Sequence, residues 1–378
     1  MKLIHLSDLH LGKRLNEFSL IEDQKYILKE ILRIICEERP NAVIIAGDIY
    51  DKAVPSSEAV ALFDDFLWRA VAGGTRVIVI SGNHDSPERI AFGSRLMDYA
   101  GVYLSPVYDG TIEPIEIEDK YGTVAFYMLP FVKPINVRRF FPDIQISDYT
   151  DAVRCALEAI EINPDVRNVL ITHQFVTGAE RSDSEDIPVG GIDNVDASVF
   201  DGFDYVALGH LHAPQFVGRE TVRYCGTPLK YSFSEKDHIK SVTVVELEEK
   251  GRVSVRTVPL EPAHDMREIR GTYDQLTLKS SYECTATEDY LHVILTDEED
   301  VPDALARLRT IYPNIMKLDY DNKRTRNTAN ADLPDVSRFK SEDALFADFF
   351  EKQNGRSMSE RQAAYSAELF EKIKEASL

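Results

Sequence analysis

The chain has 378 residues, a length that at roughly 150 residues per domain indicates two or three domains. Its formal charge is −21, from 43 Lys and Arg against 64 Asp and Glu, which argues against electrostatic coating of nucleic acid by the whole surface. No apolar stretch approaches the ~20 residues that cross a bilayer, so we expect no association with a membrane.

The cysteines are far apart and match no zinc or redox spacing. Three of the four stand in apolar or strand-like contexts, so we expect buried free thiols at Cys36, Cys155, Cys225 and Cys284. No secretory signal is visible at the start of the sequence, and together these observations predict a reduced, cytoplasmic setting.

Strand and helix patterns alternate through the first half of the chain. Apolar residues three and four apart predict a helix over 22–38, and a Pro-Ser-Ser start with a Gly-Gly stop predicts another over 57–72. Further strands are predicted over 111–117, 123–129, 222–224, 241–248 and 253–259. We expect residues 1–262 to form a mixed α/β domain, a two-layered sheet sandwich flanked by helices.

A boundary is predicted at 259–264, where the strand pattern breaks. Residues 263–320 then predict a small α+β domain, with strands over 266–272, 292–296 and 316–320 and a helix over 301–311. The polar stretch 321–337 predicts an exposed linker. Two amphipathic patterns within 338–378 predict C-terminal helices.

Five short apolar runs each stop at a cluster of Asp, Asn or His. Runs so short and so rich in β-branched residues are typical of strands buried on both faces, whose ends present ligands. The runs and their endings cover residues 2–10, 42–48, 77–85, 169–173 and 205–212. We interpret the five endings as one site for two metal ions.

The spacing within these endings favours ligands on one side of a strand end. Side chains alternate with period two, so Asp8 lies beside His10, and His210 beside His212. Asp48 follows the middle strand and could bridge two metals through its two oxygens. Carboxylate, amide and imidazole together suit Mn²⁺, Fe²⁺ or Zn²⁺ better than Mg²⁺. Two ions ~4 Å apart can hold a phosphate and activate a water.

The order of these motifs resembles the calcineurin-like metallophosphoesterase superfamily over about residues 1–260. The resemblance implies one metal held by Asp8, His10, Asp48 and His212, and a second held by Asp48, Asn83, His173 and His210. It also implies that His84 is not a permanent ligand, but stabilises the transition state and can protonate the leaving oxygen.

Other polar residues near the motifs stay open in role. We expect His5 to be a core or supporting histidine, and His238, His264 and His292 to be surface or structural residues. Asp85 could orient His84 or could be a turn residue. Asp51 stands where archaeal relatives carry a second catalytic His, and bacterial members commonly carry Asp; we expect an orienting role.

Segments between and after the motifs resemble the SbcD family of bacterial nuclease subunits: residues 7–13, 129–134, 203–215 and 226–235. This resemblance implies a nuclease core, a capping domain over 263–320 and C-terminal helices that dock on an SbcC-like coiled-coil ATPase. It implies Mn²⁺-dependent exonuclease action on duplex DNA and endonuclease action on single strands and hairpins, in repair, recombination and replication. It also implies a homodimer within a heterotetramer.

Two sets of residues are candidates for contacts with DNA or with a second copy. The basic candidates for DNA are Lys13, Arg14, Arg89, Lys133, Arg138, Arg139, Lys230, Lys323, Arg324 and Arg326. The apolar residues Phe63, Phe66, Leu67, Phe92, Leu96 and Met97 could form the homodimer seam or pack in the core.

Two alternatives share the same motifs. One is a nucleotide or phosphomonoester phosphatase, against which the capping and C-terminal regions argue. The other is a non-catalytic adaptor of the ATPase, against which the intact ligand set argues. The acidic balance further predicts that DNA binding by this chain alone is weak and sensitive to salt.

Overall fold

The computed structural model describes residues 1–180 and 194–323, together with residues 325, 346–347, 350, 357–359, 361–366 and 369 of the tail. The chain divides into two compact units, Met1–Leu295 with Val301–Asp319, and Thr296–Asp300 with Tyr320–Leu378. Both large sheets and every predicted metal ligand belong to the first unit. Most of the predicted linker 321–337 and of the predicted helices within 338–378 lies outside the described residues.

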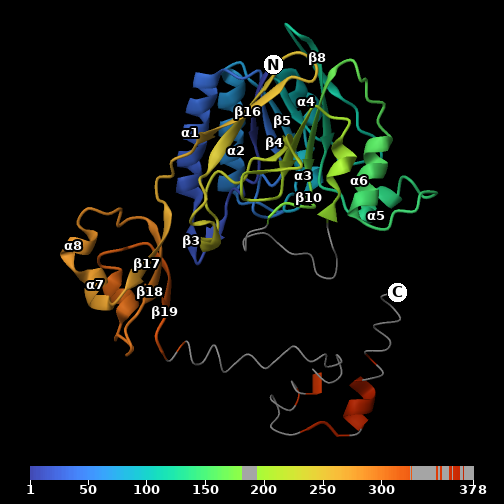
Figure 1. Ribbon diagram of the computed structural model, residues 1–378. Helices are drawn as coiled ribbons and strands as arrows, with labels where there is room; N and C mark the ends of the chain where they lie inside the picture. Colours follow the sequence, from blue (N-terminus) through green and yellow to red (C-terminus); the bar gives the residue numbers. More distant parts are fainter. Residues whose placement is uncertain are drawn as a thin grey trace. The chain divides into compact units, whose positions relative to one another are not determined.

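The first large sheet has six strands in the order β16-β15-β1-β4-β5-β6 (Figure 1). Its central strands are parallel, while β15 and β16 join β1 as an antiparallel pair. The strands span Val253–Pro259 (β16), Ser241–Leu247 (β15), Lys2–Leu6 (β1), Ala42–Ala46 (β4), Arg76–Ile80 (β5) and Val102–Leu104 (β6). β4 is buried along its whole length, as the continuous apolar runs predict for strands covered on both faces.

The second large sheet also has six strands, in the order β13-β14-β12-β9-β8-β7. β8, β9, β12 and β14 run parallel, and the two outer strands are antiparallel. The strands span Gln215–Val217 (β13), Arg219–Tyr224 (β14), Tyr205–Gly209 (β12), Arg167–His173 (β9), Gly122–Leu129 (β8) and Ile115–Asp119 (β7).

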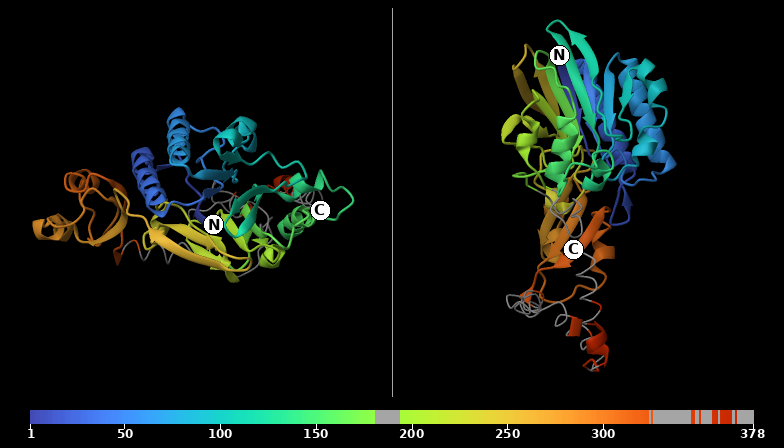
Figure 2. Two further views of the ribbon diagram at one scale, coloured as in Figure 1. Left: turned by 90° about the horizontal axis from the view of Figure 1, so that it is seen from above. Right: turned by 90° about the vertical axis from the view of Figure 1, so that its right-hand side faces the viewer.

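The two sheets pack face to face, with helices on their outer faces (Figures 1 and 2). On β1, Leu3 faces the second sheet, where Phe126 lies in the same buried cluster. Ile4 faces the other way, into a cluster with Ile31 of α1 and Phe66 of α2. Helices α1 and α2 cover the first sheet, and α6 covers the second; they span Ile21–Glu38, Ser57–Ala72 and Tyr149–Glu158. The predicted sandwich flanked by helices is confirmed.

A smaller three-stranded sheet, β17-β18-β19, follows the sandwich. Its β17 and β18 are parallel neighbours. The strands are β17 (Met266–Gly271), β18 (Tyr290–Leu295) and β19 (Ile315–Tyr320), and the helices are α7 (Tyr273–Thr277), α8 (Lys279–Tyr282) and α9 (Ala304–Leu308). The helix expected over 301–311 therefore forms only as the short α9. We refer to residues 263–320 as the capping region.

Short elements complete the described part of the chain. They are β2 (Arg14–Leu15), β3 (Phe18–Ser19), α3 (Pro87–Ile90), α4 (Ser94–Met97), α5 (Pro134–Arg138), β10 (Phe175–Val176) and β11 (Asn194–Val195). The expected burial of the cysteines holds for Cys155 and Cys225 but is wrong for Cys36 and Cys284, which are exposed. Among the described helices none combines the length and the apolar character needed to cross a bilayer.

Candidate metal centre

The strand-end motifs from both sheets meet at one edge of the sandwich. The backbone N–H of Asp8, after β1, donates to the carbonyl of Gly47, after β4 (3.0 Å). The N–H of His210, after β12, donates to both carboxylate oxygens of Asp8, each at 3.1 Å. Three overlapping groups of potential ligands result, each with ligand atoms within 4.8 Å of one another: Asp8, His10 and His212; His10, Asp48 and His84; and Asp8, Asp48 and His173.

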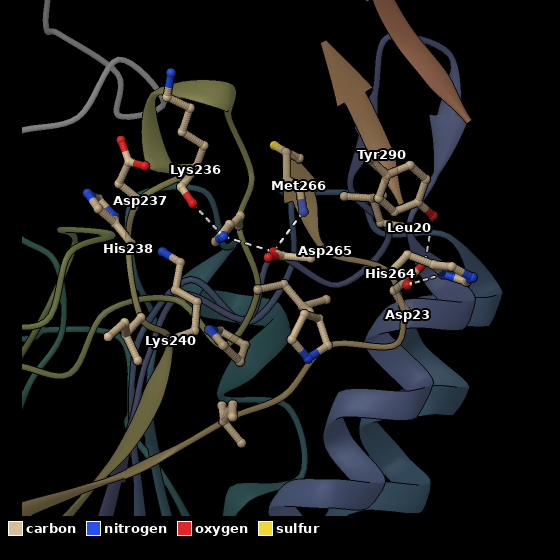
Figure 3. Close-up of a pocket in the computed structure, with 16 residues that line it drawn as sticks. Leu20, Asp23, Lys236, Asp237, His238, Lys240, His264, Asp265, Met266 and Tyr290 are labelled. Atoms are coloured by element: carbon tan, nitrogen blue, oxygen red, sulfur yellow. Dashed lines mark hydrogen bonds and ion pairs between the residues drawn. The ribbon is translucent and has the colours of Figure 1, made fainter. Parts of the chain in front are cut away.

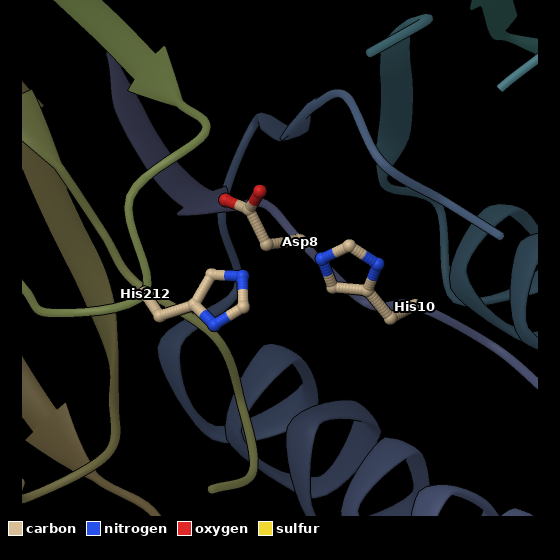
Figure 4. A group of neighbouring side chains, drawn as sticks. All are labelled: Asp8, His10 and His212. Carbon is tan, nitrogen blue, oxygen red and sulfur yellow. The ribbon is translucent and has the colours of Figure 1, made fainter. Parts of the chain in front are cut away.

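Asp8, His10 and His212 face a common point from two chain segments (Figure 4). His10 is buried, and within the described part of the chain neither of its ring nitrogens has a hydrogen-bond partner. Burial also lowers the pKa of His10 well below its ordinary value, so the ring is neutral and carries a lone pair. A buried imidazole with no donor facing it suits a metal ion, which binds the neutral form.

A second set converges on the amide oxygen of Asn83. This Oδ1 lies 3.0 Å from Nε2 of His173 and 3.0 Å from Nδ1 of His210. Nδ1 of His173 donates to the carbonyl of Ala46 at 2.8 Å, so Nε2 holds the ring's lone pair in the neutral form. That nitrogen faces the oxygens of Asn83 and Asp48. Burial alone would lower the pKa of His173, but Asp48 raises it to about 9, so either a proton on Nε2 or a metal ion can satisfy these facing atoms. The residues therefore fit a metal ion here.

Asp48 lies between the two sets. Its Oδ2 is 3.4 Å from Nε2 of His173, 3.8 Å from Nε2 of His10 and 3.9 Å from Nε2 of His84. Burial alone would raise the pKa of Asp48, but the imidazoles, His173 foremost, lower it. Asp8 lies near Asp48 and His173, and burial raises the pKa of Asp8 to about 6. An ionised carboxylate shared by both sets is placed to bridge two cations.

The ligand residues themselves occupy strained backbone conformations. Asp8, His10, Asp48 and His210 all have positive φ, at 52°, 44°, 50° and 105°. Such conformations cost of order 1–3 kcal/mol each and persist only where the surroundings impose them. These conformations turn the chain sharply after the strand ends, so that side chains from separate strands point at one centre.

Glycines allow the motif loops to approach closely. A Cβ on Gly82 would lie 2.1 Å from Oδ1 of Asp48, and one on Gly209 would lie 1.9 Å from the carbonyl oxygen of Ala46. Any side chain at Gly209 would therefore push β12 away from β4. Gly82 thus lets two motif loops of the first sheet approach, and Gly209 lets the second sheet approach the first.

His84 is placed differently from the buried ligands. Its ring remains about a quarter exposed, with Nδ1 3.1 Å from the backbone carbonyl of Asp51 and Nε2 near Asp48. Asp85 accepts hydrogen bonds from the backbone N–H groups of Ile49, Tyr50 and Gly82, so its carboxylate organises the motif loops. Burial raises the pKa of Asp85 to about 7. The carboxylate of Asp51 accepts from Lys13 at 2.8 Å.

Several supporting residues escaped the sequence analysis. Glu235 accepts a hydrogen bond from Nδ1 of His212 at 3.0 Å, and Lys240 binds the other oxygen of Glu235 at 2.6 Å. The side chain of Gln24 donates to the carbonyl of His10 at 2.8 Å, and the hydroxyl of Tyr231 donates to that of Leu9 at 2.5 Å. The sequence identifies the segment 226–235 as a motif, but it does not reveal the contact of Glu235 with His212.

The remaining histidines take structural positions. His5 is buried and bonded to the hydroxyl of Tyr205 at 2.9 Å, and burial lowers its pKa to about 3. His264 is bonded to Asp23 at 2.8 Å, and His292 to Asp319 at 2.8 Å. Burial lowers the pKa of His238.

The basic candidates for DNA contact fall into three groups. Lys13 and Lys230 form ion pairs, with Asp51 and Asp265. Arg14, Arg89, Lys133, Arg138, Arg139 and Lys323 are exposed residues. Nε of Arg138 nevertheless donates to the carbonyl of Ile146 at 2.8 Å. The last two candidates, Arg324 and Arg326, lie outside the described residues.

A pocket of about 300 Å³ with a mixed polar and apolar lining is found where the capping region meets the sandwich (Figure 3). At its wall, Asp23 of α1 bonds both His264 and the hydroxyl of Tyr290, the latter at 2.6 Å. Lys230 and Lys236 of the sandwich reach Asp265 and Glu268 of the capping region at 2.8 Å and 3.1 Å. The pocket is thus closed by ion pairs and hydrogen bonds across the junction.

Comparisons with known proteins show the family of the chain. Residues 1–214 match the family described as calcineurin-like phosphoesterase, and residues 262–354 match SbcD_C, described as the type 5 capsule protein repressor C-terminal domain. The chain is 35% identical over 322 residues to the D subunit of nuclease SbcCD from Staphylococcus epidermidis, covering 84% of this chain and 85% of that protein. A dimetal phosphatase crystal structure from Danio rerio is 13% identical, with a TM-score of 0.40, covering 69% of this chain and 99% of that one.

Proposed function

The chain belongs to the calcineurin-like phosphoesterases and, within them, to the SbcD nuclease subunits, and on this premise we propose that it cleaves DNA in partnership with an SbcC-like ATPase. It is a metal-dependent phosphodiesterase. The observation that carries the proposal is the convergence of two ligand sets on the shared carboxylate of Asp48.

We propose that Asp8, His10, Asp48 and His212 hold one divalent ion, and that Asp48, Asn83, His173 and His210 hold the other. When bound, the two ions neutralise the phosphate and activate the attacking water. The mixed oxygen and nitrogen donors suit Mn²⁺, Fe²⁺ and Zn²⁺ alike, and we propose Mn²⁺ from the resemblance to the SbcD family.

The chain's own contribution to the chemistry centres on His84. Its ring is accessible to solvent beside the buried ligands, where a phosphodiester would lie. We assign it the stabilisation of charge on the phosphate and proton donation to the leaving oxygen. The backbone carbonyl of Asp51 holds Nδ1, so Nε2 is the nitrogen that faces the substrate.

DNA as the substrate is supported by the relative named as a nuclease subunit and by the segments shared with that family. We propose exonuclease action on duplex ends and endonuclease action on single strands and hairpins, serving repair, recombination and replication in the cytoplasm. Exposed Arg89, Lys133 and Arg139 are the proposed backbone contacts. The predicted helices within 338–378 are the proposed docking segment for the ATPase.

We also propose a homodimer through the helices beside the motif loops. Phe92 and Leu96 are 85% and 79% exposed, and Tyr99 next to them is 94% exposed. A hollow of about 660 Å³ between α2 and α3–α4 is lined by Phe92 and Met97. Large exposed apolar side chains in one patch mark an interaction surface. Phe63, Phe66 and Leu67, the other half of the predicted seam, are buried in the core, although Phe63 and Leu67 also line this hollow.

Cleavage assays with Mn²⁺ on linear duplex, hairpin and single-stranded DNA, with and without an SbcC-like ATPase, test the proposal. We expect cleavage of duplex ends and hairpins. Hydrolysis of nucleotides or phosphomonoesters with no DNA cleavage in either condition would indicate the phosphatase alternative. Binding to the ATPase with no hydrolysis of any phosphoester would indicate the adaptor.

A further inference from the structure

The metal ligand His212 is held from behind by two buried charged side chains. Glu235 has no exposed surface and Lys240 is 5% exposed. Oε1 of Glu235 lies 3.0 Å from Nδ1 of His212, and Oε2 lies 2.6 Å from Nζ of Lys240. The same Nζ donates to the backbone carbonyl of His212 at 2.9 Å and to Oγ1 of Thr227 at 2.7 Å.

The pair therefore grips one residue at two points. Lys240 holds the backbone of His212 through its carbonyl, and Glu235 holds the imidazole through Nδ1. A carboxylate accepts only, so the proton of the neutral ring lies on Nδ1 and the lone pair on Nε2. Lys240 in turn keeps Glu235 ionised in a site where an isolated charge would be costly.

The two proposed metal positions differ in the group that accepts a hydrogen bond from the ligating histidine. Nδ1 of His173 donates to the neutral carbonyl of Ala46, whereas Nδ1 of His212 donates to a carboxylate. A carboxylate behind a ligating imidazole makes the imidazole a stronger donor, and loss of such a partner costs about 10–100-fold in metal affinity. The arrangement thus distinguishes the position that includes His212 from the position that includes His173.

We propose that Glu235 and Lys240 are positioning residues that set the metal affinity of the His212 position and leave the His173 position unaffected. The inference rests on the proposed two-metal centre but not on DNA as the substrate. It assigns a role to the last residue of the segment 226–235 and explains why two opposite charges are buried together there.

The test is a Mn²⁺ titration of the full chain, in which electron paramagnetic resonance measures the concentration of the free ion. We expect the wild-type protein to bind two ions. Glu235→Leu removes the acceptor, and one ion should then bind about 10–100-fold more weakly while the other keeps its wild-type affinity. Glu235→Gln keeps an oxygen acceptor without the charge and should restore part of the loss.

Two further variants separate positioning from folding. Asp119→Asn breaks another buried ion pair, with Arg167, on the far strand β7. It should lower the unfolding temperature and leave both Mn²⁺ affinities unchanged. If Glu235→Leu alone does not fold, Glu235→Leu with Lys240→Met serves in its place. This pair removes the same acceptor together with the buried cation, and the same loss is expected at one position.

Three results would overturn the inference. In the first, the Glu235 variants bind both ions with wild-type affinity. In the second, both positions weaken equally, which indicates a general disturbance of the centre. In the third, the wild-type protein itself binds fewer than two ions; that result removes the two-metal proposal as well, so the two failures are distinguishable.

Discussion

His84 differs from the buried ligands because its ring is open to solvent while its Nδ1 is held by the carbonyl of Asp51. A ring nitrogen of His84 nevertheless also lies within 4.8 Å of potential ligand atoms of His10 and Asp48. Proton donor and metal ligand are thus two roles that its position permits. They make opposite predictions for metal binding, and a substitution separates them.

Replacing His84 by Ala should lower kcat for DNA by about 10²–10⁴-fold, the usual contribution of a general acid, and leave Mn²⁺ affinity unchanged. A phosphodiester with p-nitrophenol as leaving group needs no proton donor, so its hydrolysis should fall much less. Steady-state rates on both substrates and a Mn²⁺ titration measure this. Loss of one bound ion would instead make His84 a ligand.

The motif order predicted a set of ligand residues, and the structure brings this set together, because strand ends share an edge in a parallel sheet. What sequence could not predict is the support behind them. Glu235 reaches His212 and Gln24 reaches the carbonyl of His10 across 23 and 14 residues of chain. Such contacts depend on the packing of loops, for which neither spacing nor periodicity gives a signal.

At the scale of elements, long periodic segments were predictable and short ones were not. α1 and α2 match their expected ranges within one residue. β6 escaped prediction because its three residues cannot show a period. α6 was also not predicted, although its buried residues, which include Val153 and Leu157, give it an apolar face. The strand expected over 111–117 begins only at Ile115.

The contact between strands β4 and β12 makes a prediction about Gly209. Substitution by Ala places a Cβ 1.9 Å from the carbonyl of Ala46 and 2.6 Å from His173, so the sheets must separate at the metal centre. We expect a loss of about 1–3 kcal/mol in unfolding free energy and weaker Mn²⁺ binding. Urea unfolding measures the unfolding free energy, and a Mn²⁺ titration measures the binding. Gly202→Ala, whose Cβ meets only Ile162 at 3.4 Å, is the matched control.

The ion pair of Asp119 and Arg167 ties β7 to β9 at the other end of the second sheet. Burial would raise the pKa of Asp119, but hydrogen bonds from the buried Arg167 lower it well below its ordinary value. A carboxylate with a lowered folded-state pKa stabilises the fold above its unfolded pKa of about 4, and this stabilisation is lost as pH falls below that value.

Asp119→Asn should therefore lower stability by about 1–3 kcal/mol at pH 7. It removes the carboxylate that pairs with Arg167 and with the Met1 ammonium, and Arg167 keeps only carbonyl acceptors. The difference between wild type and variant should shrink steadily from pH 5 to pH 3. Urea unfolding of both proteins across this range tests the sign. A difference that grows toward low pH would contradict the role given to this pair.

At the scale of the whole first unit, the capping region and the metal centre share three pairs of sequence neighbours. In each pair one residue bonds the capping region and its neighbour bonds a loop that carries the proposed metal ligands. Asp23 bonds Tyr290 while Gln24 bonds the carbonyl of His10. Likewise, Lys230 bonds Asp265 while Tyr231 bonds the carbonyl of Leu9, and Lys236 bonds Glu268 while Glu235 bonds His212.

Neighbouring residues cannot move independently, so the seating of the capping region and the affinity for metal should be linked, and such linkage is reciprocal. Tyr290→Phe removes the hydroxyl bonded to Asp23 and should weaken Mn²⁺ binding about 5-fold or more, the lower range of measured couplings. Conversely, Mn²⁺ should slow hydrogen exchange at Tyr290, whose N–H donates to the carbonyl of Asp265. Tyr273→Phe, on α7 and outside the junction pocket, is the matched control. If Mn²⁺ affinity is the same in both variants and exchange does not respond to metal, the capping region and the metal centre act independently.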